Sequence, residues 1–210
     1  MKTDLHAFNL KKQQRLNIRK SRQALNPQEA KLYANACFKQ LITADLLQKK
    51  QNIAIYLPFD NELDTYNIIQ YCWDNEICVF LPVLSKIRPS YLQFCQFTRQ
   101  TPLKKNHLGI DEPQITDENI IEIQSLDYLF MPLVAFDTRG YRLGMGGGFY
   151  DRSLAELSSS SPLKIGLAYD FQFQTSIPVE SWDQPMDKVF TPSQCFNFQN
   201  AHLVRPVTAI

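Results

Sequence analysis

The sequence predicts an α/β fold: a three-layer sandwich around a mostly parallel sheet, formed by a single domain over residues 1–210. The first observation is that short apolar segments alternate with segments of helical periodicity, as in strand–helix–strand units. The second is composition, since 44% of the 210 residues are hydrophobic and 20% are charged, which is enough for one sizeable core. The third is that no apolar run approaches the ~20 residues needed to cross a bilayer, so we expect no membrane partner.

The chain opens with a basic segment that we interpret as a helix over residues 1–25. A second helix starts at Asn26, because an Asn cap, a proline in the first turn (Pro27) and a glutamate three residues after the cap (Glu29) are typical of a helix N-terminus. Apolar residues repeat at helical spacing from there to Leu41.

Strands and helices alternate in the remainder of the chain. Apolar segments that end at prolines predict strands over 53–57, before Pro58, and over 77–81, before Pro82, with a helix over 65–75 between them. Further strands are expected at 92–97, 128–131, 164–168 and 188–191, and a further helix at 149–157.

Charge is distributed unevenly along the chain. The formal net charge is +1, from 22 Lys and Arg against 21 Asp and Glu, which argues against a protein that coats nucleic acid. Residues 1–31, however, hold eight basic and two acidic side chains. This segment is either a solvated helix face or an arm that meets an anion; a transit peptide is a third interpretation, which its shortage of serine opposes.

The cysteines indicate a reducing compartment. The chain has five, an odd number, with no C-x-x-C pair, so neither a disulfide framework nor a zinc site is expected. The N-terminus also lacks the apolar core of a secretory signal. We therefore expect a cytoplasmic protein whose free thiols pack as small hydrophobic groups: Cys37, Cys72, Cys78, Cys95 and Cys195.

The candidate site lies in the loops that follow the strands. Ligands bind beyond the carboxyl ends of strands in open α/β sheets, which selects residues 58–64, 132–151 and 169–183. The middle loop is exceptional, because five of the chain's seven glycines fall within residues 140–148.

This glycine cluster is interpreted as a cradle for an anion. Consecutive glycines allow backbone N–H groups to converge, and the start of the following helix adds a positive dipole end. Arg139 and Arg142 would add charge-assisted hydrogen bonds to phosphate. The pattern is neither a Walker loop nor a dinucleotide fingerprint, in which Phe149 would be the third glycine. A flexible loop without a ligand is the alternative interpretation.

Asp151 follows the cradle at the start of the predicted helix. It either favours the helix dipole or binds Mg²⁺, which takes one or two carboxylates together with phosphate oxygens. A second carboxylate would come from the region after the next strand, where three candidates remain open: Asp170, Asp183 and Asp187.

The motif at residues 135–152, Ala-Phe-Asp-x-x-Gly-x-Arg-Leu-Gly-x-Gly-Gly-Gly-x-Tyr-Asp-Arg, resembles the signature of the 5-formyltetrahydrofolate cyclo-ligase (methenyltetrahydrofolate synthetase) family. The resemblance extends from about Lys11 to Thr191. It implies an α/β sandwich and an enzyme that uses ATP and Mg²⁺ to phosphorylate the formyl oxygen of 5-formyltetrahydrofolate. N10 then closes the ring and phosphate leaves, giving 5,10-methenyltetrahydrofolate, ADP and phosphate.

The resemblance also implies roles for individual residues in the ATP site. The N-terminal helix would supply Lys11 and Arg15 to the ATP phosphates, and Asp151 and Asp183 would bind Mg²⁺. The remaining ATP contacts implied by the motif are Arg142, Leu143, Gly144, Met145, Gly146, Gly147, Gly148, Phe149 and Tyr150.

For the folate, the resemblance implies contacts from Leu57 and from Glu62, whose carboxylate suits the amine and amide N–H groups of the pterin. The loop contributes to this site through Met145, Gly146, Gly147, Gly148 and Phe149, and the implied catalytic residues are Arg142 and Tyr150. Tyr56 and Phe59 would either pack on the ring or belong to the core.

Three positions depart from the family pattern. Phe149 stands where a tyrosine is frequent, Met145 where some relatives are basic, and Trp182 where many have histidine. Two other functions stay open: a non-catalytic relative that binds nucleic acid or protein, and an ATP enzyme acting on another small molecule. We expect a monomer that binds two small-molecule substrates and no nucleic acid.

Overall fold

The computed structural model describes residues 2–157 and 162–199, with side chains from residue 7 onward. Its centre is an eight-stranded sheet in the order β13-β12-β10-β7-β1-β2-β3-β6. In chain order the strands of this sheet are β1 (Asn52–Ala54), β2 (Cys78–Leu84), β3 (Leu92–Gln96), β6 (Ile120–Ile121), β7 (Tyr128–Met131), β10 (Leu163–Leu167), β12 (Lys188–Phe190) and β13 (Cys195–Asn197).

The sheet is mixed, which corrects the prediction of a mostly parallel one. Strands β12, β10, β7, β1 and β2 are parallel neighbours, whereas β13, β3 and β6 join through antiparallel pairing. For β3 and β13 the reason is the length of the connections. Only seven residues link β2 to β3 and four link β12 to β13, and parallel neighbours need a crossover of roughly a dozen or more.

Helices cover both faces of this sheet. Residues alternate between the faces along each strand: Ile53 and Ile55 belong to one buried cluster with α2 (Pro27–Thr43) and α3 (Tyr66–Asp74). Ala54 belongs to the opposite cluster, with α4 (Phe149–Ala155). The expected three-layer sandwich is therefore confirmed.

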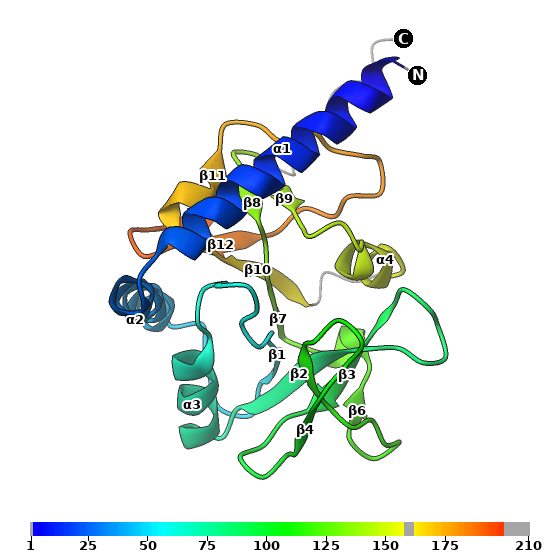
Figure 1. Cartoon of the computed structure of the whole chain (residues 1–210). Coiled ribbons are helices and arrows are strands. Elements are labelled where there is room, and N and C mark those ends of the chain that lie inside the picture. Colours follow the sequence, from blue (N-terminus) through cyan, green and yellow to red (C-terminus); the bar gives the residue numbers. More distant parts are fainter. Residues whose placement is uncertain (1, 158–161, 200–210) are drawn as a thin grey trace.

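The first helix, α1 (Lys2–Ala24), runs past a second, three-stranded sheet and contacts its middle strand (Figure 1). That sheet has the order β11-β8-β9. Its strands are β8 (Ala135–Asp137), β9 (Arg142–Leu143) and β11 (Phe173–Gln174). The remaining elements are the β4–β5 hairpin (Leu103–Lys105 and Asp111–Pro113) and the 3₁₀ turns η1 (Ile123–Ser125) and η2 (Asp170–Gln172).

Several elements agree with the sequence signals, and β2 does not. The capping box at the start of α2 is present, with Asn26 Oδ1 accepting from the N–H groups of Gln28 and Glu29. Strand β2, however, continues through Pro82 to Leu84. The Ile55 N–H still donates to Phe80 O, and the next hydrogen bond of this parallel ladder would need an N–H at residue 82. Pro82 therefore ends the pairing with β1, while β2 continues beside β3 on its other side.

All five cysteines are free, as predicted. Cys37, Cys72 and Cys95 are buried, but Cys78 and Cys195 are exposed, so the expectation that all five pack inside is corrected. No helix among the described residues has the length and apolar character of a membrane span.

Candidate active site

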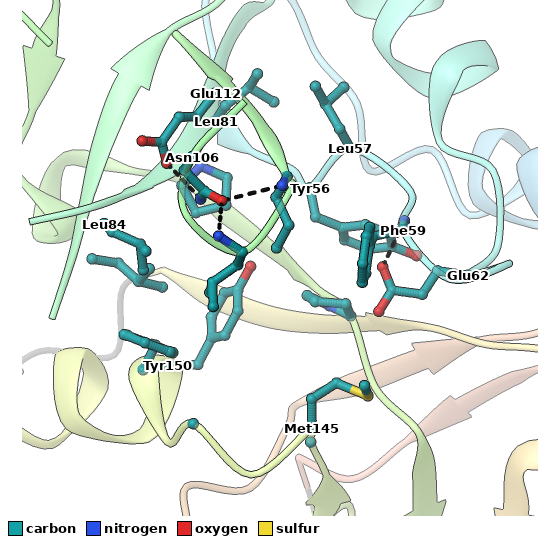
Figure 2. Close-up of a pocket in the computed structure, with 18 of the residues that line it drawn as sticks. Tyr56, Leu57, Phe59, Glu62, Leu81, Leu84, Asn106, Glu112, Met145 and Tyr150 are labelled. Carbon is teal, nitrogen blue, oxygen red and sulfur yellow. Dashed lines mark hydrogen bonds between the residues drawn. The ribbon is translucent and has the colours of Figure 1, made fainter. Parts of the chain in front are cut away.

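Two cavities of similar size meet at the glycine loop. The larger, of about 460 Å³, is lined mostly by aliphatic and aromatic side chains together with Glu62, and we call it the apolar cavity (Figure 2). The second, of about 440 Å³, is lined by Lys11, Arg15 and Asp183 among others, and we call it the charged cavity. Both cavities share one wall, which consists of Arg142, Gly144, Gly146, Gly148 and Asp151.

The glycine loop at residues 144–148 is held by its carbonyl groups. Arg15 Nε donates to Gly144 O at 2.8 Å, and Arg152 Nη2 donates to Gly147 O. Gly146 and Gly148 have φ of 104° and 65°, in the left-handed region that favours glycine. Within the described residues, none of the backbone N–H groups of this loop has a hydrogen-bond partner. The loop thus offers free donors to a ligand at the junction of the two cavities.

Arg142 holds together the chain segments that meet at the junction of the two cavities. Its side chain is only 4% exposed, and it donates from Nη2 to Asp151 Oδ1 and from Nη1 to Gln184 O, both at 2.9 Å. The N–H of Gln184 donates to the same Asp151 oxygen at 3.1 Å. Strand β9, helix α4 and the segment before β12 are therefore joined at one buried guanidinium. Since α4 has only seven residues, we assign attraction for an anion to this cation and the loop N–H groups rather than to a helix dipole.

Lys11 and Asp183 form the opposite side of the charged cavity. Lys11 Nζ lies 3.2 Å from Glu180 Oε1 and 3.7 Å from Asp183 Oδ2. Asp183 also accepts from the N–H of Glu180 at 2.8 Å. Burial lowers the pKa of Arg15, and the nearby charge of Asp183 opposes that shift. The cavity therefore combines cations for phosphate with a carboxylate.

The donor set fits Mg²⁺ as a partly solvated ion. Asp151 and Asp183 line the same cavity and are each about one-fifth exposed. Mg²⁺ usually keeps several waters and takes one or two carboxylates with phosphate oxygens, so two carboxylates are sufficient. No group of three His, Cys, Asp or Glu side chains comes together in the described ranges.

The two other carboxylates that the sequence left open are occupied elsewhere. Asp170 accepts from Ser193 Oγ at 2.6 Å, and Asp187 accepts from the Lys164 N–H at 2.8 Å. Arg139, expected beside Arg142, instead donates twice to the buried Asp137, from Nη2 at 2.6 Å and from Nε at 3.0 Å. It lines neither cavity, because its side chain closes the turn between β8 and β9.

Glu62 is the charged group at one end of the apolar cavity. Its side chain is 11% exposed, and its Oε2 accepts from the Phe59 N–H at 3.2 Å (Figure 2). Burial raises the pKa of Glu62 to about 7, while Arg22 and the Phe59 N–H act in the opposite direction. A carboxylate in such a cavity is suited to pair with N–H donors of a largely apolar ligand.

A hairpin that the sequence did not reveal closes the other end of this cavity. Asn106, between β4 and β5, accepts at Oδ1 from the N–H groups of Leu108 and Ile110 and donates to Glu112 Oε2 at 3.0 Å (Figure 2). All four residues line the cavity. The side chains of β4 are exposed, so no apolar alternation marked this strand.

The predicted residues divide between the cavities. Tyr150 lies against the apolar cavity, with its ring centroid 5.8 Å from Arg142 Cζ, and burial raises the pKa of its hydroxyl. Beyond the shared wall, Leu143 joins Lys11, Arg15 and Asp183 on the charged cavity. The predicted residues found on the apolar cavity alone are Tyr56, Leu57, Phe59, Glu62, Met145, Gly147, Phe149 and Tyr150.

Two aromatic residues at the charged cavity were not predicted from the sequence. Phe8 on α1 and Trp182 beside Asp183 both line it and are 60% and 62% exposed. The only sequence signal at Trp182 is that it stands where many relatives have histidine. Aromatic faces exposed at the edge of a cationic cavity are suited to stack on a planar base.

Comparison with known proteins places the chain in a family. The model of the 5-formyltetrahydrofolate cyclo-ligase family matches residues 7–192. A 5-formyltetrahydrofolate cyclo-ligase of Escherichia coli K12 is 37% identical over 86% of this chain and all of its own, and one of Haemophilus influenzae is 44% identical over 68% of this chain and 77% of its own. The solution structure of Aquifex aeolicus 5,10-methenyltetrahydrofolate synthetase superposes with a TM-score of 0.77 at 26% identity, covering 95% of this chain and 97% of that one.

Proposed function

This chain belongs to the 5-formyltetrahydrofolate cyclo-ligase family and is an enzyme of that family, and we propose that it converts 5-formyltetrahydrofolate to 5,10-methenyltetrahydrofolate with ATP as co-substrate and Mg²⁺ as cofactor. The folate occupies the apolar cavity, and the ATP phosphates occupy the charged cavity. The products are methenyltetrahydrofolate, ADP and phosphate.

The observation that carries this proposal is the shared wall. Phosphoryl transfer requires donor and acceptor to meet in line, with charge neutralised at the transferred group. Arg142 and the loop at residues 144–148 face both cavities, so a γ-phosphoryl held on one side would meet a formyl oxygen held on the other. Separate cavities for two unrelated ligands would not need a common cationic wall.

The chain's own groups supply the positioning for each step. The unpaired N–H groups of the loop and the Arg142 guanidinium stabilise charge on the γ-phosphoryl as its bond to ADP breaks and its bond to the formyl oxygen forms. N10 then attacks the activated carbon and its proton passes to the phosphate oxygen, the carbon–oxygen bond breaks, and hydrogen phosphate leaves with the former formyl oxygen. Tyr150 and Phe149 help to exclude water from the apolar side during both steps.

Magnesium, when bound, neutralises phosphate charge and orients the phosphates. Asp151 and Asp183 are the residues that would hold it. Each carboxylate is paired with a cation, Arg142 and Lys11 respectively. A phosphate in the cavity would compete for those cations, which would leave carboxylate oxygens of Asp151 and Asp183 available to hold the ion.

Recognition of the two organic ligands follows from the remaining lining residues. Glu62 accepts N–H donors of the pterin, and the aromatic and aliphatic wall packs on its ring. Trp182 and Phe8 stack on the adenine, where base–aromatic contact is worth about 1–3 kcal/mol per base.

An absorbance assay for methenyltetrahydrofolate tests the proposal. Wild-type protein is given 5-formyltetrahydrofolate with both ATP and Mg²⁺, with each alone and with neither, and product is expected only with both. Turnover that needs no ATP would contradict the mechanism. A folded protein that binds ATP without forming product would favour a kinase acting on another small molecule. Salt-sensitive RNA binding without ATP binding would favour a non-catalytic module.

A further inference from the structure

Arg22, near the end of α1, is a buried arginine that lines neither cavity. Its side chain is fully buried, and Nη2 lies 2.9 Å from Asp60 Oδ2. Its Nη1 lies 3.8 Å from Glu62 Oε1, beyond hydrogen-bond distance. Among the described residues, neither Nε nor Nη1 has a hydrogen-bond partner. Burying a guanidinium with part of its donor capacity unused is costly, so its retention needs an explanation.

The need to anchor the loop at residues 59–62 does not explain why a buried arginine is retained at position 22. Asp60 already accepts from Arg19 Nε at 2.6 Å and from Gln23 Nε2 at 3.1 Å. The N–H of Phe59 and the carboxylate of Glu62 close the turn from within. The loop therefore keeps its attachment to α1 without the charge of Arg22.

We infer that Arg22 is a positioning residue for folate recognition, whose buried guanidinium favours the ionised form of the Glu62 carboxylate at the wall of the apolar cavity. The inference rests on the proposed function, because it concerns the group that would accept the pterin N–H donors. Arg22 lines neither cavity, so it acts through Glu62 and not by touching the substrate.

The positive charge of Arg22 matters because most of the other groups around Glu62 favour its protonated form. Burial raises the pKa of Glu62 to about 7, and the charge of Asp60 raises it further, whereas Arg22 and the Phe59 N–H lower it. The other titratable groups near it are three tyrosines, whose hydroxyl pKa values rise in part because of the Glu62 charge: Tyr56, Tyr150 and Tyr169. Within the part of the chain that the structure describes, Arg22 is thus the cation that opposes protonation of Glu62.

The variant Arg22→Met removes the charge and retains most of the side-chain volume. Losing an opposite charge at this distance raises the pKa of a carboxyl by about 1 or more. At a pH equal to the wild-type pKa of Glu62, which is about 7, an upward shift of about 1 lowers the ionised fraction about fivefold. The KM for 5-formyltetrahydrofolate at pH 7 therefore rises about fivefold, while the KM for ATP and kcat stay near the wild-type values.

Carbon-13 NMR of protein labelled at the glutamate side-chain carboxyl tests the charge directly and without any ligand. The Glu62 signal is assigned by its loss in Glu62→Gln, and its inflection is compared between wild type and variants of matched melting temperature. The pH of this inflection should be higher in Arg22→Met than in wild type. It should stay near the wild-type value in Arg22→Lys, which keeps the charge. Arg19→Met, on the same helix and the same Asp60, is the control and should leave it unchanged. An unchanged inflection in folded Arg22→Met overturns the inference.

A double-mutant cycle then separates this role from a merely structural one. If Arg22 acts through Glu62, Arg22→Met added to Glu62→Gln raises the KM for 5-formyltetrahydrofolate no further. A full additional fivefold effect in that background overturns the inference. Failure of wild type to form methenyltetrahydrofolate would overturn the proposed function instead, and the ligand-free titration would still decide what Arg22 does to Glu62.

Discussion

Arg142→Lys is the substitution that most sharply tests the role of the shared wall. Arginine at this position donates to Asp151 Oδ1 and Gln184 O at 2.9 Å each, from two different nitrogens. A lysine ammonium keeps the charge, but as a point on a flexible stem it does not reproduce that planar fork. Lysine is preferable to alanine, which would leave Asp151 without its cation.

The expected magnitudes separate catalysis from stability. Losing one preorganised electrostatic contact costs ~3 kcal/mol in the transition state, so kcat should fall about 100-fold. A lost hydrogen bond with its acceptor partly buried costs about 1–3 kcal/mol of stability, which lowers the melting temperature by roughly 5 °C in a domain of this size. The protein stays folded at 25 °C while turnover nearly disappears.

The assay is formation of methenyltetrahydrofolate at saturating ATP and Mg²⁺, with melting measured in parallel. Arg139→Lys is the matched control, because Arg139 also pairs with an aspartate and a carbonyl, Asp137 and Ile177 O, yet lines neither cavity. It should lose stability but keep its kcat. A kcat for Arg142→Lys within about threefold of wild type, or an equal loss in Arg139→Lys, would refute the reasoning.

Three further predictions concern single residues of the two cavities. Burial raises the pKa of Glu62 from 4.5 to about 7, so the folded state binds a proton more tightly than the unfolded state and loses stability as the pH rises through this range. Without ligand, Glu62→Gln should therefore be more stable than wild type at pH 8, by at most about 3 kcal/mol of unfolding free energy, and equally stable at pH 4.5. Equal stability of the two proteins at both pH values would contradict this. Trp182→Ala should raise the KM for ATP about tenfold while Trp182→Phe does not, and no change in either would remove the stacking role. Asp183→Asn should raise the Mg²⁺ concentration for half-maximal activity about tenfold, whereas Asp187→Asn, outside both cavities, should not; equal responses would refute the assignment.

The local part of the site could be predicted from the sequence because its signals are local. Glycines at positions 144–148 are conspicuous in a chain with only seven, and the cap at Asn26 is read from three adjacent residues. The alternation of strands and helices also predicted the central strands of the sheet. Its antiparallel edges were missed, because the predicted strand at 77–81 ended three residues early and no strand was predicted at β13.

The remaining features depend on contacts between distant segments. Arg22 and Glu62 are 40 positions apart and meet only when α1 packs on the loop after β1. The choice of Asp183 over Asp170 and Asp187 was also open, because composition does not reveal which carboxylate another element has already bound. The sequence of strand β4 shows no alternation of apolar and polar residues, because neither of its faces is buried.

The division of the two substrates between two cavities is tested most directly by binding titrations on a crossed pair of variants. Glu62→Gln alters only the apolar cavity and Lys11→Gln only the charged one. Glu62→Gln should weaken binding of 5-formyltetrahydrofolate about tenfold or more and leave Mg²⁺–ATP binding near wild type, and Lys11→Gln should do the reverse. Equal weakening of both ligands by either folded variant would contradict the assignment of one cavity to each substrate.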